Sequence, residues 1–304
     1  MTNYSGMTAR DLPEARQDLI DWAAGRGGQV LAQHGGGPLG PIIATSARHA
    51  ELYYVNADMT ALARQIGAGL DVYALAAEDL PARSGLLVWD NPATSERPGA
   101  APTAVLWTST GTRIMISLLC PTPAYRAWCT EVSTDATAAA PLVTAGRLVY
   151  RGRGPTLPLD GPDTPWDRLR FVDHEESTRT LLATLILIRQ PVDARRSLHE
   201  VEDVAPSKAS RKRIVQAGGD PTSTVRYVTL RQNLRRNDHG TADSDHARRV
   251  YQHRWFVRMH RRRYPDREDP AGWSKKWVGP YFVVPRGCED APIIGGDRVN
   301  VLRR

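Results

Sequence analysis

Cysteine, lysine and long apolar runs are all scarce in this chain of 304 residues. Its three cysteines, Cys120, Cys129 and Cys288, form no CxxC pair, which argues against a disulfide framework and against a zinc knuckle. The longest strongly apolar run, "LLATLILI" at 181–188, is far below the roughly 18 to 20 residues of a membrane-spanning helix. We therefore expect reduced thiols, no metal site and no membrane partner.

The start of the chain also lacks a targeting pattern. Residues 1–18 contain no basic start followed by an apolar segment, which is the pattern of a secretory signal. The sequence therefore predicts a cytoplasmic protein. Lysine is rare beside arginine, and alanine, glycine and aspartate are abundant. This usage is typical of a GC-rich genome, such as that of an actinobacterium or one of its phages.

Charge is divided unevenly along the chain. Residues 205–304 contain 22 Lys+Arg against 10 Asp+Glu, a net charge of +12, whereas residues 1–204 contain 18 against 23, a net charge of −5. A basic end of this kind suggests a polyanion partner, because phosphate contacts supply sequence-independent affinity. A solvated arginine-rich surface is the alternative.

Hydrophobic periodicity predicts an α+β domain over residues 1–192, with helices packed on an antiparallel sheet. The glycine-rich "GGGPLG" at 35–40 fits no phosphate-binding motif, so we expect a turn there. Asn56 or Asp58 is the expected cap of the second helix, and Trp89 and Trp107 are expected in the core. The predicted helices are 12–28, 57–70 and 173–191, and the predicted strands are 50–56, 85–90, 103–109, 112–120 and a further strand within 141–154.

Residues 193–222 are polar and charged without sustained apolar periodicity, so a linker is predicted there. Its "SRKR" at 210–213 is basic but too short to identify a partner. Residues 223–304 then form a small, β-rich, basic module in this prediction. Its expected strands are 224–230, 250–264, 273–285 and 297–304.

The most unusual segment is "HRWFVRMHRRRYP" at 253–265, which contains two histidines, five arginines and three aromatic residues. On a single strand, Arg254, Arg258 and His260 would share one face. Arginine suits bidentate phosphate contacts, and aromatic rings stack on unpaired bases. The predicted nucleic-acid contacts are Arg254, Arg258, His260, Arg261, Arg262, Arg263, Tyr264, Lys275, Lys276 and Trp277.

Four histidines recur every seven residues from His239 to His260, but a loop and a strand would not bring their rings together, so we predict neither a metal site nor a cofactor. An enzyme is an open alternative. In it His260 or His253 would act as the general base of a metal-independent ribonuclease, with arginine stabilising the developing phosphate charge.

Three segments carry a family resemblance: "VRYVTLRQN", "YQHRWFVRMHRRRYP" and "KKWVGPYFVVPRGCEDAPIIGGDRVNVLRR". They resemble the C-terminal module of a large family of proteins from actinobacteria and their phages. "LYYVNADMTALA" and "DLPARSGLLVWDNP" extend this resemblance over most of the chain.

The His/Arg motif with its basic-Trp-x-x-Pro strand is also similar, more distantly, to the C-terminus of a phage-borne type V-A anti-CRISPR family. That family lowers the level of an effector nuclease during translation, through the nascent peptide and loss of its message. Met259 and Arg261 stand where the family pattern has glycine and tryptophan. The matching positions here are Arg258, His260, Arg261, Tyr264, Lys276, Trp277 and Pro280.

These observations together predict a protein associated with a mobile element, in which residues 1–192 recognise a protein or nascent-peptide target. The basic module would bind RNA or a ribosome–nascent-chain complex, so that expression of the target falls. Besides the ribonuclease, the open alternative is a DNA-binding regulator or replication accessory protein, although the basic half has no helix-turn-helix signal.

Overall fold

The computed structural model describes residues 7–33, 37–68, 80–91, 101–122, 147–159, 176–189 and 199–230, and the strand residues 254–257, 260–265, 273–278, 281–283 and 293–294. The chain divides into two compact units. The first comprises Met1–Arg189 with His199–Leu230, and the second comprises Gln190–Leu198 with Arg231–Arg304. We describe each by itself.

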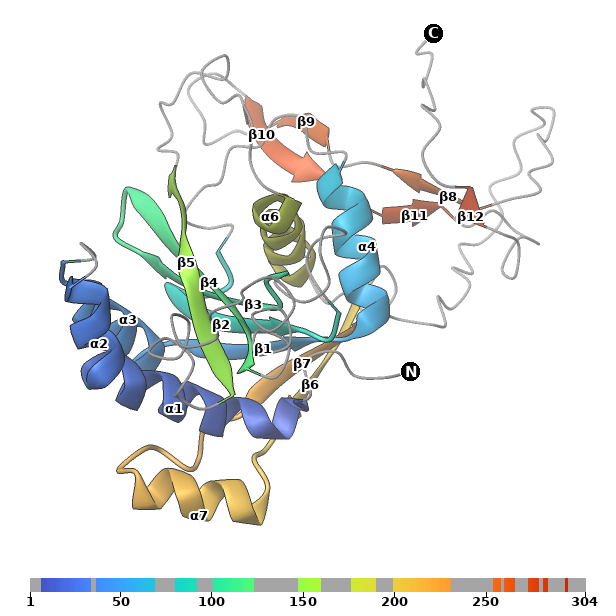
Figure 1. Cartoon of the computed structure of the whole chain (residues 1–304). Helices are drawn as coiled ribbons and strands as arrows, with labels where there is room; N and C mark the ends of the chain where they lie inside the picture. The colour runs from blue at the N-terminus through green and yellow to red at the C-terminus, as the bar shows by residue number, and fades with distance from the viewer. Residues whose placement is uncertain are drawn as a thin grey trace, which may run out of the picture. The chain divides into compact units, whose positions relative to one another are not determined.

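The first unit is built on a seven-stranded sheet with the order β5-β4-β3-β2-β1-β7-β6 (Figure 1). Its strands are β1 (Glu51–Val55), β2 (Ser84–Trp89), β3 (Ala104–Ser109), β4 (Arg113–Pro121), β5 (Leu148–Pro158), β6 (His199–Val204) and β7 (Val225–Leu230). Each of the five strands predicted between residues 50 and 154 is confirmed, and the fold of this unit is α+β.

The sheet is mixed, which corrects the expected antiparallel sheet. β2, β3, β4 and β5 are antiparallel neighbours as predicted, but β1 runs parallel to both β2 and β7. The physical reason is the helix between β1 and β2, since a helical crossover returns the chain in the same direction. The buried run of β1 and β2 agrees with a parallel centre covered on both faces.

Helices cover both faces of this sheet (Figure 1). One face carries α1, α2 and α3, whose buried side chains form a continuous core with residues of β1, β2 and β3. α4 and α6 pack together on the other face. The helices are α1 (Leu12–Ala24), α2 (Arg26–Leu31), α3 (Leu39–Arg48), α4 (Ala57–Ala68), α6 (Glu176–Arg189) and α7 (Lys208–Gln216), with a short 3₁₀ turn η1 (Ala9–Asp11).

The three predicted helices are confirmed as α1, α4 and α6. Asn56 caps α4, because its Oδ1 accepts a hydrogen bond of 2.9 Å from the backbone N–H of Met59. Both tryptophans lie in the core, each with 0% of its surface exposed. Trp89 Nε1 donates to Thr184 Oγ1 of α6 at 3.1 Å, which satisfies a buried donor.

The turn expected at "GGGPLG" is confirmed at Gly37 and Pro38, which lie in a turn between α2 and α3, with Gly37 at a positive φ of 49°. Pro38 precedes α3, and Gly40 lies within that helix. A Cβ atom at Gly40 would meet Gly28 Cα at 2.5 Å, so glycine here permits the close approach of α2 and α3.

Residues 193–222 differ from the expected linker. β6 and α7 occupy much of this range, and β7 lies within the sheet of the first unit between β1 and β6. The boundary expected at 192, and a module beginning at 223, are therefore corrected. The physical reason is long-range pairing: β7 is held by Leu52 to Val55 of β1, far away in sequence.

In the second unit the described residues are all strand. β9 (His260–Pro265) and β10 (Trp273–Val278) form an antiparallel pair. β8 (Arg254–Val257) pairs with β11 (Tyr281–Val283) and with β12 (Ile293–Ile294). The strand predicted at 297–304 lies outside the described residues. Across the described ranges, none of the helices combines the length and the apolar character needed to span a bilayer.

Candidate nucleic-acid interface

Most of the predicted nucleic-acid contacts lie on the β9–β10 pair. The register sets Arg261 opposite Trp277, Arg262 opposite Lys276 and Arg263 opposite Lys275. His260 lies opposite Val278. Because residues directly opposite one another in an antiparallel pair are on the same face, each face of this hairpin holds a mixture of cationic and aromatic positions.

The segment 250–264 does not form the single strand that we expected. β8 pairs with β11 and β12, whereas β9 pairs with β10 in a different sheet. Arg254 and His260 therefore lie in different sheets, so alternation along one strand does not place them on one face. Arg258, the third residue expected on that face, and the alternative catalytic residue His253 lie outside the described residues.

A second polar group lies in the first unit, where the parallel strands end. Tyr54 donates from its hydroxyl to Asp90 Oδ1 at 2.9 Å, and its ring lies 5.8 Å from that of Tyr227. Burial, followed by the negative charges of Asp90, Glu202 and Asp58, raises the pKa of Tyr227. The titration of this phenol therefore lies further into the alkaline range than that of an ordinary tyrosine, which is already protonated at neutral pH.

The acidic side chains at this edge do not make a metal centre. Within the ranges that the structure describes, no three His, Cys, Asp or Glu side chains are grouped so as to hold a metal ion. The sequence offered no signal for this edge, because Asp90 and Tyr227 are brought together only by the pairing of β2, β1 and β7.

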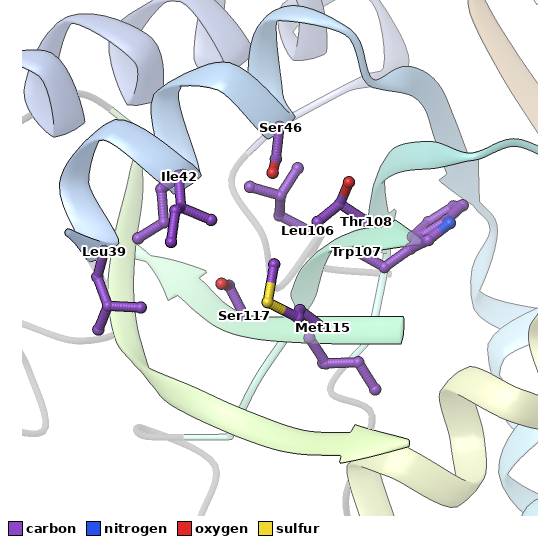
Figure 2. A pocket seen from close by; sticks show the side chains of 10 residues that line it. Leu39, Ile42, Ser46, Leu106, Trp107, Thr108, Met115 and Ser117 are labelled. Atoms are coloured by element: carbon purple, nitrogen blue, oxygen red, sulfur yellow. The ribbon is translucent and has the colours of Figure 1, made fainter. Parts of the chain in front are cut away.

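A small cavity lies between α3 and the sheet. Figure 2 shows Leu39 and Ile42 of α3 on one side of it and Met115 and Ser117 of β4 on the other. Its volume of about 20 Å³ is close to that of a single water-sized sphere. This mainly apolar cavity is too small for a nucleotide or a large side chain, so we assign no ligand to it.

The sequence prediction also left out one group of cations. Lys208, Arg211 and Lys212 fall in the segment that was expected to be a linker, but the structure places them on α7, where all three are exposed. The sequence signal in this segment was "SRKR" at 210–213. Four residues are too few to show whether they lie on a helix or which face they occupy.

No family model, curated protein or solved structure matches this chain.

Proposed function

We propose that this chain is an RNA-binding protein that holds RNA through its second unit, recognises a protein or nascent peptide through its first, and so lowers expression of that target. The observation that carries the RNA part is the register of β9 and β10. It sets Arg261–Arg263 directly opposite Lys275–Trp277, which gathers five cations and one tryptophan on two short strands.

Such a hairpin is electrostatically unfavourable by itself. Like charges directly opposite one another destabilise a strand pair, and here Arg262 faces Lys276 and Arg263 faces Lys275. A polyanion relieves this repulsion, and release of its counterions adds affinity. Trp277, opposite Arg261, supplies an aromatic ring of the type that stacks on unpaired bases. Single-stranded RNA therefore suits these residues better than a duplex.

The charges of the two units support the same assignment. The second unit contains 19 Lys+Arg against 10 Asp+Glu, a net charge of +9, whereas the first contains 21 against 23, a net charge of −2. The positive potential of the chain is thus concentrated in the unit that holds the hairpin. Recognition of a protein or nascent peptide by the first unit is carried over from the type V-A anti-CRISPR family, and the motif that resembles this family lies in the second unit, at residues 258–264 and 276–280.

Fluorescence anisotropy of the full chain with a short labelled oligouridylate tests the RNA part. The variant Arg261→Ala/Arg262→Ala/Arg263→Ala should bind more weakly, and the slope of log affinity against log salt should fall by about two, since each phosphate contact contributes about 0.7. The control Arg48→Ala/Arg113→Ala/Arg189→Ala removes the same charge from exposed positions of the first unit. If both variants lost RNA affinity equally, the effect would come from the total charge of the chain and not from the hairpin.

Crosslinking in the natural host tests the complete proposal. We expect the tagged protein to recover ribosomes, one enriched message and the peptide that this message encodes. Recovery of specific DNA alone would assign the chain to DNA regulation instead. Cleavage of the labelled RNA that disappears in His260→Ala would make it a ribonuclease.

A further inference from the structure

The helix α7 divides the basic segment "SRKR" between two faces. Ser210 and Arg213 bond to Glu14 of α1, with the Arg213 side chain still 54% exposed, whereas Lys208, Arg211 and Lys212 lie at exposed positions on the other face. The exposed cations are spaced three and four residues apart, which places them side by side on one face of a helix. Lys208, Arg211 and Lys212 thus form one basic surface on α7.

Contacts with α1 fix the orientation of this surface. Glu14 of α1 is buried, and its Oε2 accepts a hydrogen bond from Ser210 Oγ at 2.8 Å. Arg213 holds the same carboxylate through Nε, 2.6 Å from Oε1, and through Nη2, 2.9 Å from Oε2. Ile214 is buried beside these contacts, with 1% of its surface exposed. α7 is therefore attached along one side, and its opposite side faces solvent among the described residues.

Within the described ranges, the exposed face of α7 is not compensated by negative charge. Among the residues that the structure describes, no acidic side chain forms an ion pair with Lys208, Arg211 or Lys212. The first turn of α7 contains no acidic residue either, although acids are favoured there by the helix dipole. Instead Lys208 occupies that turn, and like charges three and four residues apart repel one another. An anionic partner would relieve both the repulsion among these cations and the unfavourable position of Lys208 in the first turn.

α7 and the β9–β10 hairpin have lysine in common. Of the 40 basic residues only four are lysines, and they are Lys208 and Lys212 on α7 and Lys275 and Lys276 on β10. The ammonium group is a compact charge on a flexible stem that binds phosphate as a point charge. The two elements therefore share a residue type that the rest of the chain does not use.

We propose that the outward face of α7, formed by Lys208, Arg211, Lys212 and Val215, is a second RNA contact that binds the phosphate backbone. This inference rests on the proposed function and adds a contact in the first unit. Val215 is 58% exposed and offers a small apolar patch beside the cations. Helices that lie on membranes need large apolar residues such as Trp, Phe or Leu on one face, and the outward face of α7 has only this valine.

The test compares two charge-matched variants of the full chain with labelled oligouridylate at several salt concentrations. We expect Lys208→Ala/Arg211→Ala/Lys212→Ala to bind more weakly, with the salt slope reduced by about two. The variant Arg48→Ala/Arg113→Ala/Arg189→Ala should keep the slope of the unmodified chain. A thermal melt serves as the folding control, since removing exposed like charges should not lower stability.

The hairpin variant separates the failure of this inference from the failure of the proposed function. If Arg261→Ala/Arg262→Ala/Arg263→Ala weakens RNA binding while the α7 variant does not, the α7 contact is overturned and the proposed function stands. If the unmodified chain binds no RNA, both are overturned. In a different outcome, the α7 variant loses binding to phosphatidylserine vesicles while its RNA binding stays unchanged. That result would assign the face to a membrane surface and would also overturn the inference.

Discussion

At the scale of single residues, Glu14 accepts contacts from three side chains, those of Arg147, Ser210 and Arg213. Burial would raise the pKa of this carboxyl, but hydrogen bonds from Arg147, Arg213 and Ser210 outweigh that effect and lower it. Arg147 Nη1 lies 2.9 Å from Oε1 of Glu14 and comes from the segment just before β5. One carboxylate thus connects α1, α7 and the start of an edge strand.

The lowered pKa predicts how the stability of the first unit depends on pH. A carboxyl with a folded-state pKa below its ordinary value of 4.5 stabilises the fold above that value, and this contribution is lost as the pH falls through the folded-state pKa. Glu14→Gln should therefore lower the free energy of unfolding by about 1 kcal/mol at neutral pH. The loss is limited because Arg213 keeps contact with water, which screens its interaction with Glu14. The difference from the unmodified chain should shrink below pH 4.5.

Urea unfolding at neutral and at acidic pH measures this difference. Glu202→Gln is a suitable control, because Glu202 is exposed on β6 and exposed substitutions usually change stability by less than about 0.5 kcal/mol. An effect of Glu14→Gln that is the same at all pH values would show that the loss of a hydrogen-bond acceptor, and not the loss of charge, explains the contribution of Glu14.

At the scale of elements, the contact between α4 and α6 depends on Gly67. A Cβ atom at this position would meet the backbone of Arg179 in α6, with C at 2.8 Å and O at 2.9 Å. Backbone atoms cannot turn aside as a flexible side chain can, so the two helices must separate. Gly67→Ala should therefore destabilise the unit by about 1 to 3 kcal/mol, although alanine by itself favours a helix by about 1 kcal/mol.

The reverse substitution in the same helix gives the matched control. Ala61 is exposed on α4, so Ala61→Gly measures the helix preference without the contact and should cost about 1 kcal/mol in thermal or urea unfolding. If Gly67→Ala proved neutral or stabilising, the close approach of α4 and α6 in the structure would be contradicted.

Elements with a sustained apolar stripe could be predicted, and those that depend on distant partners could not. α1, α4 and α6 each bury several apolar residues at helical spacing. In β6 only His199 is buried, so its sequence "HEVEDV" lacks the buried alternate face of an ordinary strand. α7 buries only Ser210 and Ile214. β6 is held by its pairing with β7, on the far side of α7, and α7 is held by Glu14 of α1, 199 residues before Arg213. Periodicity within either element cannot indicate these contacts.

The same distinction applies to the candidate interface. Residue type alone identified Arg261–Arg263 and Lys275–Trp277 as candidate contacts. Their opposition in register and the separation of Arg254 into another sheet required the pairing of the strands. The face on α7 depends on Glu14 and Arg213, which are 199 residues apart, and no pattern within α7 itself points to that contact.

At the scale of the whole molecule, β7 determines where the first unit can be divided. The sheet order places β7 between β1 and β6, so a fragment of residues 1–192 would lose two strands and leave β1 at the edge. Leu52, Tyr53, Tyr54 and Val55 of β1 are all buried. An exposed, apolar strand edge pairs with other chains and aggregates.

We therefore expect the fragment 1–192 to be insoluble or to melt without a cooperative transition, whereas the fragment 1–230 keeps all seven strands and melts cooperatively. Size-exclusion chromatography and circular dichroism measured on the two fragments in parallel would show this difference. A folded, monomeric fragment 1–192 would contradict the parallel pairing of β1 with β7, and would return the boundary of the first unit to the position that local sequence alone suggests.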